Sequence, residues 1–157
     1  MRSGINAELS IAAIARTVAR ALDAANAPAP GSVTAVLTDD AELTELNAEH
    51  MGVDGPTDVL SFPMLEPEVF RSAGNRAKPL PGARRRTHIG DIAISVERAI
   101  EQAQEGRGGH TGDVRWSPAD ELRLLVTHGT LHLCGWDHAE PAEEAAMRAL
   151  ERHLLSA

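Results

Sequence analysis

Apolar and polar residues alternate along this chain with two periods, one typical of helices and one typical of strands. Near the N-terminus, apolar residues recur at helical spacing and predict a helix packed by one face. These residues are Ile11, Ile14, Val18, Leu22 and Ala25. Similar patterns predict four more helices, at residues 39–50, 96–105, 117–134 and 141–154. Between the helices, β-branched or alternating apolar residues predict strands at residues 33–38, 58–62 and 88–95. The pattern therefore predicts a chain that contains both helices and strands.

Residues 66–87 lack this periodicity and predict a loop. The segment holds Glu66 and Glu68 against six basic residues, which are Arg71, Arg76, Lys78, Arg84, Arg85 and Arg86. A run of charge is commonly a solvated loop, but beside a catalytic site it can also contact phosphates. Just after it, Gly90 in the strand at 88–95 predicts a bulge or a close approach of two backbones.

Composition narrows the class of protein. The chain has 157 residues, which is about one domain, and its single cysteine excludes an internal disulfide and fits a reducing cytoplasm. A net charge of −8 and an aromatic content of 3% argue against binding nucleic acid by overall charge or by base stacking.

Arg16 and Arg20 interrupt the one stretch that resembles a signal peptide, so we expect a cytosolic protein with no membrane segment. The glycines of residues 106–112 lack phosphate-loop spacing, so no nucleotide cofactor is expected.

The strongest chemical signal is the sequence HGTLHLCGWDH at residues 128–138. On a helix, His128 and His132 lie about 40° apart around the axis and one turn apart along it. Gly135 can end the helix and let the chain bring His138 back toward them. Three imidazoles leave the fourth position of a tetrahedral zinc open, which is the arrangement of a catalytic site.

Two neighbouring residues refine this interpretation. Cys134 lies about 240° around the helix from His128, so we expect it to pack in the core and not to bind metal. Zinc peptidases with this histidine spacing carry a glutamate directly after the first histidine as general base, whereas this chain has Gly129. Peptidase chemistry is therefore not expected.

With the histidine motif in place, the chain resembles the YbeY family of bacterial endoribonucleases, the rRNA maturation factors. The family motif HGxLHLxGYDH appears with Trp136 in the tyrosine position, and GPTDVLSFPM at residues 55–64 and IGDIAIS at residues 89–95 match two further family segments. The resemblance covers about residues 33–155. Met51 stands where the family usually carries an arginine, and the family's N-terminal strand is hard to find in residues 1–8.

The resemblance implies one α/β, zinc-hydrolase-like domain over residues 1–157. Its small mixed sheet would have four strands, or three without the N-terminal one, packed with about five helices around a central, buried, metal-binding helix. It further implies one zinc per chain, held by His128, His132 and His138. The implied activity is zinc-dependent cleavage of single-stranded RNA in maturation of the 16S rRNA 3′ end and in ribosome biogenesis. The implied partners are ribosomal RNA and the ribosome or its small subunit.

Other roles rest on weaker signals. Asp137 and Asp91 are candidate proton acceptors or partners of a ligand imidazole, and a turn or capping role is as good an interpretation of Asp91. Arg84, Arg85 and Arg86 are the densest supply of positive charge for RNA. Whether water at the metal or the RNA 2′-hydroxyl attacks is left open.

Two rival functions also stay open. A metal-dependent hydrolase of another substrate is favoured by the acidic net charge. A non-catalytic ribosome assembly factor with a structural metal is favoured by Gly129 and Met51. Both alternatives include a bound metal, which is catalytic in the hydrolase and structural in the assembly factor.

Overall fold

The computed structural model describes residues 9–71, 85–105 and 116–157. Within these ranges one mixed sheet contains β1 (Gly31–Thr38), β2 (Val59–Pro63) and β3 (Thr87–Ser95), in the order β1-β3-β2. The central strand β3 runs parallel to β1 and antiparallel to β2. The three predicted strands and the α/β class are confirmed. The N-terminal strand of the resemblance would fall in residues 1–8, outside the described residues, as do Arg84 and the glycines of residues 106–112.

Five of the helices match the predicted ones: α1 (Ile11–Ala24), α2 (Asp40–Leu46), α4 (Val96–Gln104), α5 (Pro118–Leu133) and α6 (Pro141–Ser156). A π-helical segment, η1 (Asn47–Met51), continues α2. The prediction of a loop throughout residues 66–87 was wrong, because a short helix, α3 (Glu68–Arg71), forms there. Its Phe70 is buried and joins the main core, a tertiary contact that one helical turn cannot show as periodicity.

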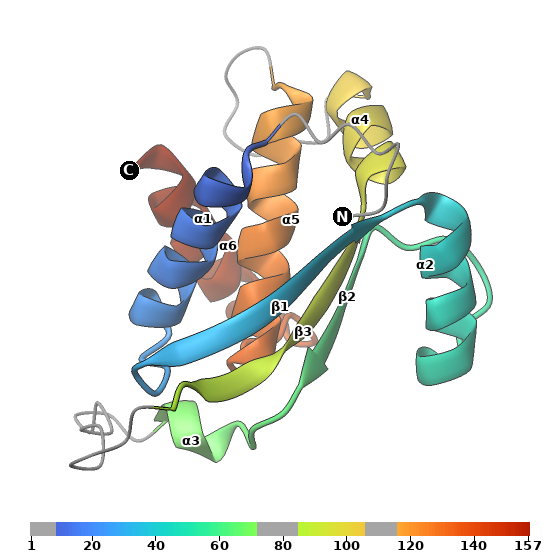
Figure 1. Cartoon of the computed structure of the whole chain (residues 1–157). Helices are drawn as coiled ribbons and strands as arrows, with labels where there is room; N and C mark the ends of the chain where they lie inside the picture. Colours follow the sequence, from blue (N-terminus) through green and yellow to red (C-terminus); the bar gives the residue numbers. More distant parts are fainter. Residues whose placement is uncertain (1–8, 72–84, 106–115) are drawn as a thin grey trace.

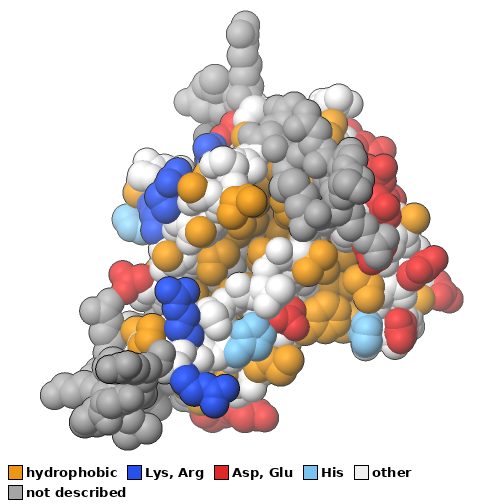
Figure 2. Space-filling view, viewed as in Figure 1, with side chains coloured by type: hydrophobic (Ala, Val, Ile, Leu, Met, Phe, Trp, Pro, Cys, Tyr) orange, Lys and Arg blue, Asp and Glu red, His pale blue; other side chains and the backbone are white. Residues whose placement is uncertain are grey.

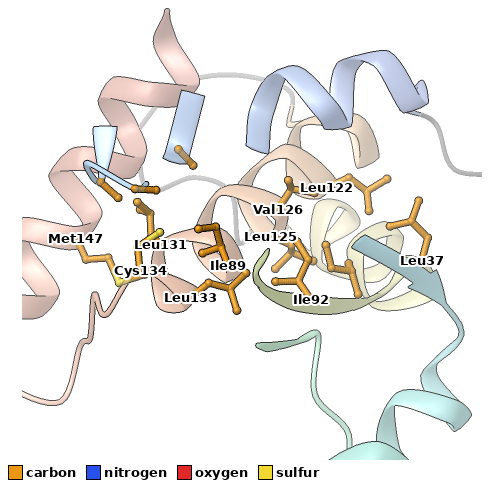
Figure 3. Packing of buried hydrophobic residues seen from close by; sticks show 14 of the residues in the cluster. Leu37, Ile89, Ile92, Leu122, Leu125, Val126, Leu131, Leu133, Cys134 and Met147 are labelled. Atoms are coloured by element: carbon orange, nitrogen blue, oxygen red, sulfur yellow. The ribbon is translucent and has the colours of Figure 1, made fainter. Parts of the chain in front are cut away.

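The helix α5 occupies the centre of the fold, as predicted. It lies against β2 and β3 and is flanked by α1, α4 and α6, whereas α2 lies across the other face of the sheet (Figure 1). Figure 3 shows the main core, in which Ile89 and Ile92 of β3 face Leu122, Leu125, Val126, Leu131 and Leu133 of α5. A smaller cluster of Leu43, Leu60 and Ala93, with Leu46 and Phe62 against it, fills the space beneath α2.

The ends of α5 are set by local sequence. Ser117 caps the N-terminus, where its side chain accepts from the Asp120 backbone N–H at 3.2 Å and Asp120 accepts in return from the Ser117 N–H at 3.1 Å. This capping box and Pro118 begin the helix. At the other end the Gly135 and Trp136 N–H groups donate to the His132 and Leu131 carbonyls, both at 3.1 Å. This is the Schellman arrangement, and Gly135 adopts the left-handed φ of 83° that it requires.

Gly90 satisfies both expectations made for it. The register between β1 and β3 shifts opposite it, between Ser32 and Val33. Its φ is 155°, and a Cβ there would lie 2.5 Å from the Phe62 carbonyl oxygen and 2.8 Å from Leu133. Only glycine therefore lets β3 pass this close to both β2 and α5.

The predicted packed face of α1 holds except at its first residue. Ile14, Val18 and Leu22 pack against the core, whereas Ile11 is 74% exposed. Ile11 lies at the first helical position, on the rim of a groove between α1 and β1, so the periodic pattern extends one turn beyond the packed part. In the described ranges, no helix combines the length and apolar content that crossing a membrane requires.

Candidate metal centre

The three histidines of the 128–138 motif converge at the C-terminal end of α5. The Nε2 atoms of His128 and His132 lie 3.0 Å apart, and His138 returns after the turn at Gly135. Its ring centre is 5.5 Å from that of His128 and 5.0 Å from that of His132. One nitrogen from each ring lies within 4.8 Å of the others, so the cluster could hold a metal ion.

The environment of His132 favours the neutral imidazole, the form that binds metal. Burial lowers the pKa of His132 below its usual value near 6.5, and the neighbouring His128 and His138 rings lower it further. A hydrogen bond with the Trp136 backbone and the charge of Asp137 oppose this shift without cancelling it. His128 is also half-buried and His138 is exposed, so the cluster is open to solvent on one side.

Glu151 is the residue of this site that sequence reasoning missed. It lies on α6, and its Oε1 is 2.6 Å from His128 Nδ1, on the side of the ring away from His132. Glu151 is 8% exposed and lies one turn after the buried Met147. A glutamate on the apolar face of the last helix was the available signal, because a buried carboxylate requires a partner.

Of the two aspartates proposed from the sequence, only Asp137 lies beside the histidines. Asp137 is exposed, and its Oδ1 accepts from the His138 backbone N–H at 2.7 Å, so it shapes the turn that carries His138. Asp91 pairs with His88 Nε2 at 2.8 Å. On β3 it alternates with Ile92, which faces α5, so it projects from the opposite face of the sheet. The structure therefore brings Asp137, but not Asp91, next to the histidines.

The predicted basic residues that the structure describes, Arg85 and Arg86, do not line either cavity that reaches the histidines. Arg85 and Arg86 are exposed, and Arg86 lines the groove between α1 and β1. Figure 2 shows that basic side chains on this face of the molecule gather over α1 and near the start of β3, while acidic ones gather over α2 and α4. Positive charge is therefore localised despite the net charge of −8.

The histidines open into a groove between β2 and the end of α5, with a volume of about 560 Å³. Met51, at the position where the resemblance led us to expect an arginine, is 45% exposed on its wall. Among the described residues, the lining includes Asp58 and Asp137 but no lysine or arginine. A second cavity of about 290 Å³ reaches His128 and His138 from between α5 and α6, and Glu151 and Arg148 line it.

Gly129 is explained by the packing of α5 on the sheet. A Cβ at this position would lie 3.0 Å from Val59 and 3.2 Å from Ile92, and the Ser61 hydroxyl donates to the Gly129 carbonyl at 3.0 Å. The space beside Gly129 is thus occupied by strands. A glutamate of the peptidase kind would have no room there.

Comparison with known proteins agrees with these features. The family model described as Endoribonuclease YbeY matches residues 3–157. Proteins named Endoribonuclease YbeY from Symbiobacterium thermophilum and Mycolicibacterium gilvum are 41% and 42% identical to this chain. These alignments cover 91% and 98% of this chain and 83% and 77% of the relatives.

The fold has a solved counterpart as well. The solution structure of TM1509 from Thermotoga maritima superposes with a TM-score of 0.54 at 24% identity, covering 95% of this chain and 83% of that one. At this identity the likeness concerns the fold alone. The family match over nearly the whole sequence, together with the histidine cluster at the end of α5, shows that the chain belongs to the Endoribonuclease YbeY family.

Proposed function

We propose that this protein is a zinc-dependent endoribonuclease that cleaves single-stranded RNA during maturation of ribosomal RNA, at the 3′ end of 16S rRNA. The observation that carries the proposal is the convergence of His128, His132 and His138 in a chain of this family. Relatives named as endoribonucleases supply the substrate class. The proposed partner is the ribosome or its small subunit, and the proposed location is the cytoplasm.

The donor set fits zinc. Three neutral imidazoles suit zinc and other late transition metals better than magnesium or calcium, which prefer oxygen ligands. A zinc ion bound this way lowers the pKa of water toward neutrality and polarises a phosphoryl oxygen. His128 and His132 would bind from a helix that is packed on several sides, which keeps the two ligand nitrogens in place.

The surrounding residues shape the substrate site. The groove beside β2 opens to solvent next to the three histidines, so a single RNA strand could reach them. Gly129 lets β2 lie directly against α5, so Val59 and Ser61 form the groove wall next to the histidines. The Asp137 carboxylate beside His138 is the proposed proton acceptor closest in sequence to a ligand.

Charge favours a second candidate function. The described lining of the groove has carboxylates and no lysine or arginine. It therefore suits a small or uncharged substrate better than the negatively charged phosphodiester backbone of RNA. A metal-dependent hydrolase of another substrate, or an assembly factor whose metal is structural, would share the same histidines. RNA cleavage and the response to metal removal separate these functions.

The test combines metal analysis with cleavage of a single-stranded RNA. Wild-type protein purified without chelator should contain about one zinc per chain and cleave the RNA, and His132→Ala should do neither. Chelation should abolish cleavage and leave the far-ultraviolet circular dichroism unchanged. Loss of fold on chelation would instead indicate a structural metal. A folded, zinc-loaded protein that leaves RNA intact would favour the hydrolase of another substrate.

A further inference from the structure

We propose that Glu151 is a positioning residue for the metal centre, holding His128 in the one tautomer that presents Nε2 to the metal. The inference rests on the proposed metal site, and it extends that site from α5 to α6. The helix α6 contributes none of the three histidines. Through Glu151, however, it determines which nitrogen of His128 is available as a ligand.

The geometry gives each nitrogen of His128 a separate task. Nδ1 is 2.6 Å from Glu151 Oε1, and Nε2 is 3.0 Å from His132 Nε2. An ionised carboxylate can only accept a hydrogen bond, so Nδ1 of a neutral His128 must carry the proton. Nε2 is then left with its lone pair toward the other two histidines.

Burial supports a positioning role over an incidental surface contact. The side chains of Glu151 and His128 are 10% and 28% exposed, so Glu151 is largely shielded from solvent and His128 partly so. Placing a carboxylate here is costly unless it accepts a hydrogen bond, and His128 Nδ1 is within hydrogen-bond distance. The position of Glu151 is well defined, because Met147, one turn earlier on α6, is 1% exposed and packs in the main core.

The same helix offers a matched control. Glu144 lines the same cavity between α5 and α6, but its partner is Arg148. Its side chain is 43% exposed, and it has no contact with a histidine among the interactions described. Glu144→Gln therefore removes a neighbouring carboxylate from the cavity while leaving the His128 hydrogen bond intact.

The test measures zinc affinity of the folded full-length protein by competition with a chromogenic chelator. Glu151→Ala should weaken zinc binding about 10- to 100-fold, the usual effect of losing such a partner. Glu151→Gln keeps the volume but loses the charge, so its affinity should be intermediate. Glu144→Gln should bind zinc like the wild type. The rise in melting temperature on adding zinc should shrink in the same order, most for Glu151→Ala.

A purely structural role for Glu151 predicts a different pattern. The melting temperature would fall equally with and without zinc, and the affinity of the folded protein would stay at the wild-type value in both Glu151 variants. That result would overturn the inference. If Glu151→Ala does not fold, Glu151→Gln and the absorption spectrum of its cobalt form carry the test, with an altered spectrum expected and a wild-type spectrum contradicting the inference. Wild-type protein that binds no zinc would instead refute the proposed function itself.

Discussion

The sequence suggested site residues in two regions, the histidine end of α5 and the stretch from Arg84 to Asp91. In the structure, the residues of the first region converge, whereas the described residues of the second do not reach the histidines. The histidines converge within 4.8 Å and have a buried partner in Glu151. Arg85 and Arg86 are exposed, and Asp91 faces away from α5. Spacing on a helix specifies where side chains point relative to one another, whereas a cluster of charge in an aperiodic segment does not. The following predictions test this contrast.

The largest effect expected is loss of metal in acid. Because the pKa of His132 is below its usual value near 6.5, its neutral form persists to lower pH than that of a free histidine. Zinc should therefore stay bound at pH 7 and be lost as the pH falls below about 6, when protons compete for the imidazoles. Zinc content after dialysis across a pH series measures this. Full retention of zinc at pH 4 would contradict a histidine-only site.

The second prediction concerns the packing that supports the histidines. Gly129→Glu should destabilise the protein by about 3 kcal/mol or more, because the side chain meets Val59 and Ile92 and places a carboxylate in the core. The variant should also lack peptidase activity. Denaturant unfolding measures the stability. Wild-type stability combined with wild-type RNA cleavage would show that this space is not needed by the strands.

The third prediction tests the basic residues. Replacing Arg84, Arg85 and Arg86 with alanine should weaken RNA binding and reduce its salt dependence by up to about three phosphate contacts, while zinc content stays unchanged. A matched control is Arg16→Ala with Arg20→Ala, which removes exposed cations from α1. An equal effect of both sets would indicate unspecific attraction. Unaltered binding by the triple variant would assign the RNA surface elsewhere.

The smallest effect is expected at Asp91. Its pair with His88 is about 40% exposed on both sides, so Asp91→Asn should cost less than about 1 kcal/mol and leave zinc content unchanged. Zinc analysis and thermal unfolding measure both quantities. If the variant lost zinc or RNA cleavage with its fold intact, Asp91 would return as a catalytic candidate and the contrast drawn above would fail.

Local chemistry made much of this protein predictable from its sequence. Asp39 caps α2 by accepting from the Glu42 N–H at 2.8 Å, and Gly135 ends α5 in the conformation expected of it. Cys134 is 3% exposed in the core, and burial raises the pKa of its thiol to about 12, in line with the packing role predicted for it. Each of these features depends on residues within a few positions of one another, where helix geometry and turn preferences apply directly.

Contacts between residues that are far apart in the sequence became visible only in the tertiary structure. Glu151 is 23 residues from His128, and only the docking of α6 brings the two together. The short helix α3 depends on Phe70 reaching the core, and the direction of Asp91 depends on which face of the sheet α5 covers. The sequence itself determined the histidine spacing, the caps and the strands, because these follow from local backbone geometry. The partners of those residues follow from packing between elements, which no single stretch of sequence contains.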